Sequence, residues 1–517
     1  MTNLTRYDVL EFKIVIPQDN FNDLYISENK YLRKKNVSKR NLSISLCKDY
    51  IDHEFLRIED CTIKVKTFHG GIIPLYYRLF ERKLHISNVP HLLIKTAETV
   101  EIKAQTLCQS ISGFDFPINN IFYQINKLES SSYYEWNGST FVFKGSQFKQ
   151  LKNPPKDFFV ESLKYRFEKY FDNKENIVLL ISGGYDSRLN AALVKYWKQR
   201  KENRIYAYHR WQSQAEFDLA QSVADKISVK LNLSKRNEFV DQAVGIGQDD
   251  DYILFMNSGY RKSINIWSAH LNTVLEEHPE CAIIGMGAEP HKGKYYRQII
   301  NLRRDSEKIF GYSSKFFSYL QKKLNVKKTY NFQHDYFNFL CKLANEIYDD
   351  LYSRIDFVHY HANIVNRFGI RTHYFFHRYN IDFPILDKEI LENVFSLKRN
   401  DKEAFGLITY SINKLFPEFN TIGYISGNTP SIEKKSRAKE MLDNIRKIRY
   451  SPKKLFVKEK DLFKITEMKK VPSTALTNSL KALLDKDISH KASRSTVRIF
   501  NYLILLESMY SVDFKLV

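Results

Sequence analysis

The run IVLLISGGYDSRLN, residues 177–190, holds the most chemically suggestive spacing in the chain. Five apolar residues lead directly into Ser182-Gly-Gly-Tyr-Asp-Ser187, so a buried strand is expected to end there in a tight polar turn. Glycine permits positive φ and a close approach of the backbone to a ligand. We expect these two features at Gly183 and Gly184. The first amides of a following helix would face the same turn and favour an anion.

Asp186 sets a condition on the anion that this turn could hold. Its own charge repels a phosphate group unless a magnesium ion lies between the carboxylate and the phosphates. The hydroxyls of Ser182 and Ser187 add hydrogen-bond donors. The pattern therefore favours a nucleotide polyphosphate with Mg²⁺, and the competing interpretation is a strand and a flexible turn with a serine or aspartate cap.

The elements around the turn alternate between strand and helix. Apolar periodicity predicts helices over Asp157–Phe171, Ser187–Gln199 and Ala215–Ile227, and buried strands over Ile177–Ile181, Arg204–Tyr208 and Cys281–Ile284. Such alternation implies right-handed crossovers and a parallel sheet covered on both faces. Ligands of these sheets bind at the carboxyl ends of the strands, where the 182–187 turn falls. From about Phe310 the pattern is mostly helical.

The first 150 residues differ, because short β-like segments separated by polar turns replace the alternation. The clearest are Thr62–Val65, Leu75–Arg78 and Lys83–Ser87. The stretch Lys152–Lys156 contains two adjacent prolines, which cannot continue a helix or a central strand. We therefore predict one domain over residues 1–150 and a second over residues 155–517.

Composition limits the protein class. With 517 residues, 43% of them hydrophobic, the chain can build two or more cores. It has no run of about 18 apolar residues and no apolar stretch near Met1, which predicts a cytoplasmic protein without a membrane span. The net charge of +21 would suit nucleic acid, but it is spread along the chain, so nucleic-acid binding is not favoured.

Cysteines and histidines do not suggest a metal centre. The five cysteines contain no CxxC pair, so neither a disulfide framework nor a zinc site is supported, and reduced core residues are expected. His361, His373 and His377 lie in an aromatic-rich region without a carboxylate at metal-binding spacing. Core or surface roles are expected for them.

The 182–187 turn resembles the pyrophosphate-binding loop of the N-type ATP pyrophosphatases, a superfamily that includes asparagine synthetase, GMP synthetase and several tRNA-modifying enzymes. It is not a Walker loop, because no Gly-Lys-Ser/Thr follows. Further stretches are similar to the class II, glutamine-hydrolysing asparagine synthetase family and follow its order. They are His69–Arg78 with Leu84–Leu93, Ile121–Leu128, Gly285–Tyr295 and Pro384–Leu397, so the resemblance spans about residues 60 to 420.

The resemblance implies a fold, a site and a reaction. The fold is α/β: a degenerate, Ntn-type glutaminase-like β-rich domain, then a parallel-sheet synthetase domain of the PP-loop type with a mostly helical C-terminal part. Asp186 and Glu289 are implied as catalytic and metal-binding carboxylates, with ATP and Mg²⁺ as cofactors. The implied nucleotide-binding residues are Ser182, Gly183, Gly184, Asp186, Ser187, Gly285 and Gly287. The implied reaction, as in asparagine biosynthesis, adenylates a carboxylate with release of pyrophosphate and passes the acyl group to ammonia or an amine, giving an amide and AMP.

The chain departs from the family at several positions. Glu289 and Pro290 stand where the family has two acids, and Thr2 stands in place of the cysteine nucleophile, so no glutamine hydrolysis is expected. Tyr185, at the variable position of the loop, is expected to pack rather than react. The family's pyrophosphate-binding lysine is missing from Phe419–Pro430. The candidates to replace it are Lys292, Lys294, Lys434 and Lys435.

Three functions stay open on this basis. The first is an amide-forming ligase that acts on a small-molecule, peptide or glycan carboxylate with a separate amine donor. The second is a nucleotide-binding pseudoenzyme, which the departures motivate. The third is a tRNA-modifying enzyme with the same loop, which the positive charge suggests. The sequence selects neither the acyl substrate nor the amine donor, and it leaves a homo-oligomer open.

Overall fold

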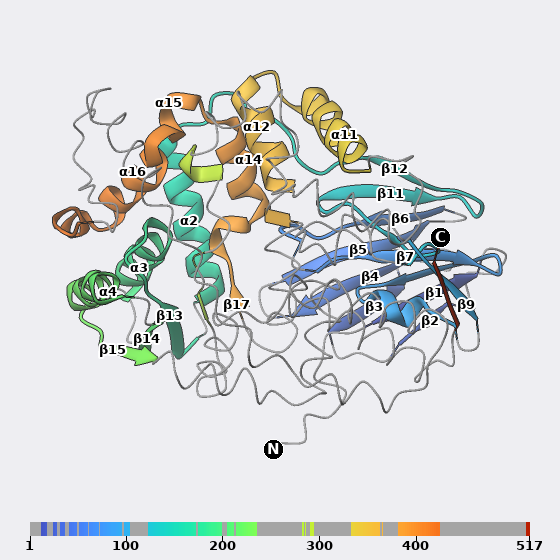
Figure 1. Cartoon of the computed structure of the whole chain (residues 1–517), viewed down its shortest axis with the longest axis horizontal. Helices are drawn as coiled ribbons and strands as arrows, with labels where there is room; N and C mark the ends of the chain where they lie inside the picture. The colour runs from blue at the N-terminus through green and yellow to red at the C-terminus, as the bar shows by residue number, and fades with distance from the viewer. Residues whose placement is uncertain are drawn as a thin grey trace, which may run out of the picture.

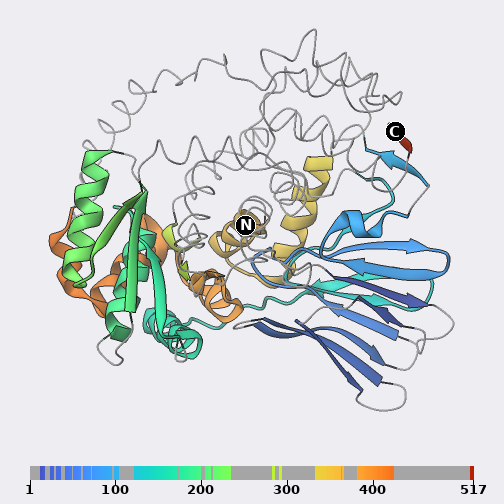
Figure 2. The same cartoon turned by 90° about the horizontal axis from the view of Figure 1, so that it is seen from below.

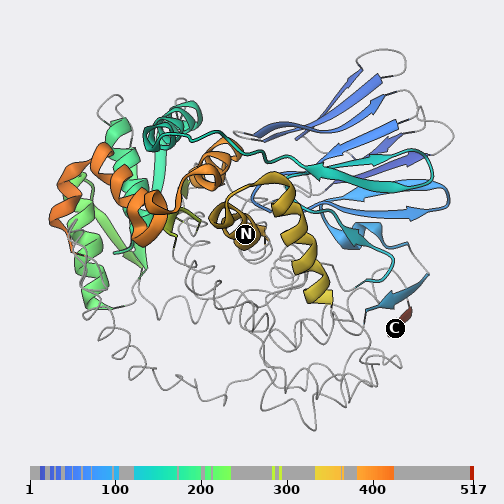
Figure 3. The same ribbon diagram turned by 90° about the horizontal axis from the view of Figure 1, so that it is seen from above.

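In the computed structural model of the chain, the described residues are 12–17, 24–27, 31–36, 41–48, 51–59, 62–71, 73–95, 98–103, 122–171, 174–198, 204–210, 213–234, 282–283, 285, 290–293, 332–361, 364–365, 381–423 and 513–516. They form an α/β structure (Figure 1). Antiparallel sheets lie at one end and a parallel sheet with its helices lies at the other, as the view from above also shows (Figure 3).

Two antiparallel sheets contain most of the N-terminal strands. The first has the order β10 (Asn126–Lys127), β7 (Tyr76–Phe80), β8 (Lys83–Ser87), β1 (Lys13–Pro17) and β2 (Tyr25–Ile26). The second has the order β12 (Phe141–Ser146), β11 (Ser132–Trp136), β6 (Thr62–Lys66), β5 (Ile51–Glu59), β4 (Asn41–Lys48) and β3 (Leu32–Asn36). The three strands predicted from the sequence are therefore confirmed as β6, β7 and β8.

The apolar faces of these two sheets pack against each other. Along β6 the side chains of Ile63 and Val65 are buried while their neighbours are less so, which is the alternation of a strand with one covered face. The ring of Tyr77 on β7 lies 4.6 Å from the ring of Phe141 on β12. This aromatic contact joins one sheet to the other.

The remaining large sheet is parallel throughout, as predicted. Its order is β15 (Leu231–Ser234), β14 (Arg204–Arg210), β13 (Asn176–Leu180), β16 (Ala282–Ile283) and β17 (Ile381–Asp382). The chain runs outward from β13 to β15 and then returns to the other side of β13 as β16. The strand order therefore reverses between β13 and β16, and such a switch point is where open α/β sheets bind their ligands.

Helices occupy the rest of the described chain. The helices between the strands are α2 (Lys156–Phe171), α3 (Tyr185–Lys198) and α4 (Gln214–Lys226), which confirms the three predicted from periodicity. Those that follow are α11 (Phe332–Ile347), α12 (Leu351–His359), α14 (Lys388–Ser396), α15 (Arg399–Lys402) and α16 (Gly406–Leu415). Short 3₁₀ turns are η3 (Pro90–Leu93), η4 (Pro290–Lys292), η7 (Pro384–Leu386), η8 (Glu403–Phe405) and η9 (Pro417–Thr421). Among the described helices, none has both the length and the apolarity needed to cross a bilayer.

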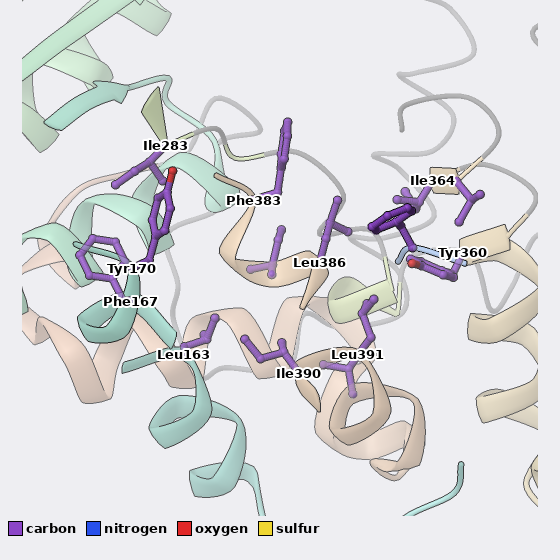
Figure 4. Close-up of a cluster of buried hydrophobic side chains, with 14 of the residues drawn as sticks. Leu163, Phe167, Tyr170, Ile283, Tyr360, Ile364, Phe383, Leu386, Ile390 and Leu391 are labelled. Carbon is purple, nitrogen blue, oxygen red and sulfur yellow. The ribbon is translucent and has the colours of Figure 1, made fainter. Parts of the chain in front are cut away.

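The core beneath the switch point is built mainly by α2. Its inward residues Leu163, Phe167 and Tyr170 are buried, as helical spacing predicted. Figure 4 shows them in one cluster with Ile283 of β16 and Ile390 of α14. Burial of each such side chain stabilises the fold by about 1.5–3 kcal/mol. The position of β16 is thereby tied to the helices that follow it.

A glycine turn between the antiparallel sheets and the helices carries a direct contact between the two parts. The backbone N–H of Gly70 donates to the hydroxyl of Tyr360 over 2.7 Å. Gly71 has φ of 67°, and a Cβ built on it would lie 2.6 Å from the carbonyl oxygen of Val365. Nearby, Nδ1 of His361 lies 2.9 Å from Oε1 of Glu129. Positive φ at Gly70 and Gly71, with the close approach at Gly71, explains the two glycines that follow His69.

The chain ends beside its N-terminal part. Strand β18 (Asp513–Leu516) pairs in parallel with β9 (Thr99–Ile102), forming a separate two-stranded sheet (Figure 2).

Replacing Gly71 with alanine is expected to destabilise the protein by about 2–4 kcal/mol, since the methyl group adds a backbone clash to an unfavourable φ. Gly145→Ala is the control for backbone strain without a clash, because its φ of +143° also disfavours an L side chain while a Cβ there meets nothing within 4 Å. The control is expected to lose about 1–2 kcal/mol. Chemical denaturation of both variants measures the difference, and equal losses would contradict the proposed contact with Val365.

Stability is expected to fall on acidification because of His69. Burial, reinforced by the positive charges of His53, Lys388, Lys66 and His361, holds the pKa of His69 well below its ordinary value. Below about pH 6.5 the unfolded chain therefore binds a proton that the folded chain does not, so this contribution to stability is complete above that pH and is lost as the pH falls.

The loss is about 1.4 kcal/mol per pH unit between the two pKa values. Denaturation of wild type and His69→Gln at pH 7.5 and pH 5.5 tests it, and the variant is expected to be the less sensitive to pH. An equal pH response in both proteins would show that His69 is not the group responsible.

Candidate functional site

The 182–187 turn lies at the carboxyl end of β13 and leads directly into α3. The carbonyl of Gly184 accepts the backbone N–H of Arg188 at 3.3 Å, so Gly184 caps the helix. Helix α3 starts at Tyr185, two residues earlier than predicted. Asp186 and Ser187 consequently belong to its first turn, where the backbone amides have no acceptor within the helix.

Hydroxyl groups hold the turn in shape. Oγ of Ser187 donates to the carbonyl of Ser182 over 2.7 Å, and the two hydroxyl oxygens lie 3.0 Å apart. The N–H of Gly184 donates to Oγ of Ser182 at 3.3 Å. Neither Gly183 nor Gly184 has positive φ, so this expectation was wrong. The turn instead passes into a right-handed helix immediately, which requires negative φ.

Gly285 brings the other side of the switch point against this turn. It follows β16, and a Cβ at this position would lie 3.0 Å from both the carbonyl carbon of Asp186 and the nitrogen of Ser187. Real Cβ atoms rarely approach backbone so closely. The absence of a side chain therefore lets the ends of β13 and β16 meet at the start of α3.

Arg188 was not singled out from the sequence, yet it is fully buried beneath the turn. Its guanidinium donates to the carbonyl of Ile422 over 2.8 Å, to that of Gly183 over 3.3 Å, and to that of Gly423. Since C=O and N–H point in opposite directions across a peptide plane, holding the Gly183 carbonyl toward Arg188 turns the Gly184 N–H to the opposite side, where it donates to Oγ of Ser182. An arginine among the mostly apolar buried positions of α3 was the available signal.

Lys292 makes the most consequential contact of the site. Its Nζ donates to Oδ2 of Asp186 over 2.7 Å, and the two side chains are only 14% and 18% exposed. The lysine is held in place by its neighbours in η4. Pro290 and His291 are buried, and the ring of His291 lies 5.3 Å from that of Phe159.

These contacts bear on the magnesium ion that the sequence implied. Magnesium requires octahedral oxygen ligands at short distances. In the described part of the chain, no group of three or more His, Cys, Asp or Glu side chains could hold a metal ion. At Asp186 an ammonium already takes one carboxylate oxygen. Asp186 is thus the one implied magnesium ligand among the described residues, and Oδ2 of its carboxylate already accepts an ammonium; Glu289 and Gly287 lie outside the described residues.

Other predicted residues fall into place around the turn. The ring of Tyr185 stacks on that of Phe405 at 4.3 Å and 13°, which confirms that it packs. In the Pro384–Leu397 segment, Asp387 caps α14 by accepting the N–H of Glu389 at 2.9 Å. Lys294, Lys434 and Lys435 lie outside the described residues, as do His373 and His377.

Two further expectations were tested away from the turn. Cys341 is a free thiol, as expected, and is partly buried with its side chain packed against the core. His361 is buried and pairs with Glu129, in agreement with a structural role. A surface cavity of about 490 Å³ lies between residues 150–153 and residues 396–400, and none of the residues at the turn lines it.

The arrangement as a whole suits an anionic ligand. The start of α3 carries partial positive charge, and Arg188 and Lys292 add two full positive charges against the one carboxylate of Asp186. A phosphate group bound at the turn would meet backbone amides, serine hydroxyls and an ammonium. These are the groups that stabilise a polyphosphate.

No protein-family model and no curated protein matches the chain. Among solved structures it is similar to a tRNA thiolase of Methanococcus maripaludis with its iron–sulfur cluster, at 13% identity over 41% of this chain and 80% of that one, with a TM-score of 0.21. It is also similar to an NH₃-dependent NAD synthetase of Campylobacter jejuni in complex with nitrate, at 15% identity over 37% and 85%, again with a TM-score of 0.21. Similarities as low as these do not indicate a function, which has to be inferred from the chain's own residues.

Gly285→Ala is expected to destabilise the protein by about 1–3 kcal/mol, because the added methyl group forces β16 away from the start of α3. Gly423→Ala is the control beside the same site, since a Cβ there meets nothing within 4 Å. It is expected to stay within about 0.5 kcal/mol of wild type. Thermal and urea denaturation report both changes, and an unaltered Gly285→Ala protein would mean that the two backbones do not meet as described.

Proposed function

We propose that this protein is an asparagine synthetase-like, ATP-dependent ligase that adenylates a carboxylate and transfers the acyl group to ammonia or an amine. The observation that carries the proposal is the convergence of the 182–187 turn, the start of α3 and Gly285 at the switch point of a parallel sheet. The resemblance of the turn to the pyrophosphate-binding loop of this superfamily supports a nucleotide as the ligand.

The chemistry assigns each group a task. A carboxylate is a poor acyl donor until one of its oxygens becomes part of a good leaving group, and adenylation achieves this with release of pyrophosphate. The amides at the start of α3 and the hydroxyls of Ser182 and Ser187 would hold the phosphates. Lys292 would lie beside the charge that develops on the departing pyrophosphate. Magnesium belongs to the proposal as the ion that accompanies ATP, and no step is assigned to a protein-bound ion.

The N-terminal part takes a scaffold role in this proposal. We assign residues 1–150 to a degenerate glutaminase-like domain of Ntn type and residues 155–517 to the ATP-binding domain. The hairpin of β7 and β8, which carries the Pro-Leu-Tyr-Tyr motif at residues 74–77, supports the first assignment. In this proposal the nitrogen comes from free ammonia or from a separate amine substrate.

The ion pair at Asp186 favours one alternative, a nucleotide-binding pseudoenzyme of the same family. A carboxylate that is neutralised by Lys292 is a poor metal ligand, because the ammonium occupies one of its oxygens. In that case the site would bind ATP without turnover. The two candidates share the binding site and differ in whether pyrophosphate is formed.

The Gly184→Asp substitution tests the nucleotide site without endangering the fold. Gly184 caps α3, and aspartate is a favourable cap, so the variant is expected to fold normally while its carboxylate takes the amides that phosphate would use. ATP binding measured by calorimetry is expected to weaken at least about tenfold from this charge alone. Gly184→Ala is the neutral control, because its methyl group meets only Oγ of Ser182 at 3.3 Å.

Exchange of labelled pyrophosphate into ATP, measured with panels of carboxylates, tests the chemistry. Carboxylate-dependent exchange in wild type that disappears in Gly184→Asp is the result expected of a ligase. ATP binding without exchange for any carboxylate would favour the pseudoenzyme. Equal ATP binding by wild type and Gly184→Asp would refute the site itself.

A further inference from the structure

The ion pair between Lys292 and Asp186 is largely buried and held by the fold, unlike a contact between exposed surface side chains. Both side chains are largely buried, and their atoms lie 2.7 Å apart across a separation of 106 residues in the sequence. Gly293 follows Lys292 with φ of 56°, so the chain turns sharply there. The buried Pro290 and His291 on the other side prevent the lysine from moving away freely.

The position of the pair gives it a function in anion binding. Asp186 lies in the first turn of α3, where the amides and the helix dipole would otherwise attract phosphate. A bare carboxylate at that place would repel a polyphosphate strongly in a partly buried site. A positive ion beside Asp186 removes this repulsion, and Lys292 provides that charge from within the chain.

We infer that Lys292 neutralises Asp186 in place of a divalent cation, so that the site binds the polyphosphate of a nucleotide without a protein-bound metal ion. The inference rests on the proposed nucleotide site. The ammonium has three hydrogen-bond donors and gives one of them to Oδ2 of Asp186. Its remaining donors could contact a phosphate oxygen while the pair stays intact.

Calorimetry of ATP binding in EDTA and in excess Mg²⁺ tests this inference, with four proteins compared. Wild type is expected to bind ATP in both buffers with affinities within about threefold of each other, as expected when no protein-bound ion is needed. Lys292→Met removes the ammonium from Oδ2 of Asp186, so its affinity in EDTA is expected to fall by about tenfold or more. Lys292→Arg keeps the charge and should retain most of the affinity.

The double variant Asp186→Asn with Lys292→Met decides between charge and structure. It removes both charges, so affinity in EDTA is expected to recover to within about threefold of wild type. Thermal denaturation of each variant confirms that it is folded before binding is compared. Restored binding in the double variant cannot arise from a merely structural role of Lys292.

Three results separate the possible failures. If wild type binds ATP in neither buffer, the nucleotide site fails and the inference fails with it. If wild type binds ATP in Mg²⁺ but not in EDTA, the nucleotide site stands and the inference is overturned. If Lys292→Met binds as wild type does in EDTA, Lys292 is irrelevant to the anion and the inference is likewise overturned.

Discussion

The candidate site depends on how closely two segments of backbone approach at the switch point of the parallel sheet. Gly285 lies so near the start of α3 that a single methyl group would have to displace Asp186 or Ser187. This contact joins the carboxyl ends of β13 and β16, two strands that are adjacent in the sheet but far apart in the sequence. A wider gap would separate the helix amides from the segment that carries Lys292. The geometry of the anion site therefore depends on the absence of a side chain at Gly285.

Much of this arrangement could be predicted from the sequence, because periodicity is a local property. The apolar run before Ser182 and the helical stripes around it gave the strand, the turn and the helix to within two residues. The positive φ expected at Gly183 and Gly184 was wrong, since the helix starts directly after them. The partners of Lys292 and Arg188 were beyond prediction, because each contacts residues more than a hundred positions away.

The N-terminal strands show a second limit of sequence reasoning. The strands β6 to β8 either alternate apolar and polar residues or are rich in aromatic ones and were recognised, whereas β3, which reads LRKKN, has neither feature. It lies at the edge of its sheet, where a run of positive charges discourages pairing with another molecule. The charged residues of β3 therefore suit an exposed edge rather than a buried position, and hydrophobic periodicity cannot identify β3 as a strand.

The parallel pairing of β18 with β9 affects how the chain is made. During synthesis β9 leaves the ribosome well before β18, so β9 has to wait for its partner while the helical part between them is translated. Contacts between such distant segments also form slowly once both strands have been made, because closing so large a loop is entropically costly. Pairing of β9 with β18 is thus a late step in maturation, since this edge cannot assemble until the segments between the two strands have been made.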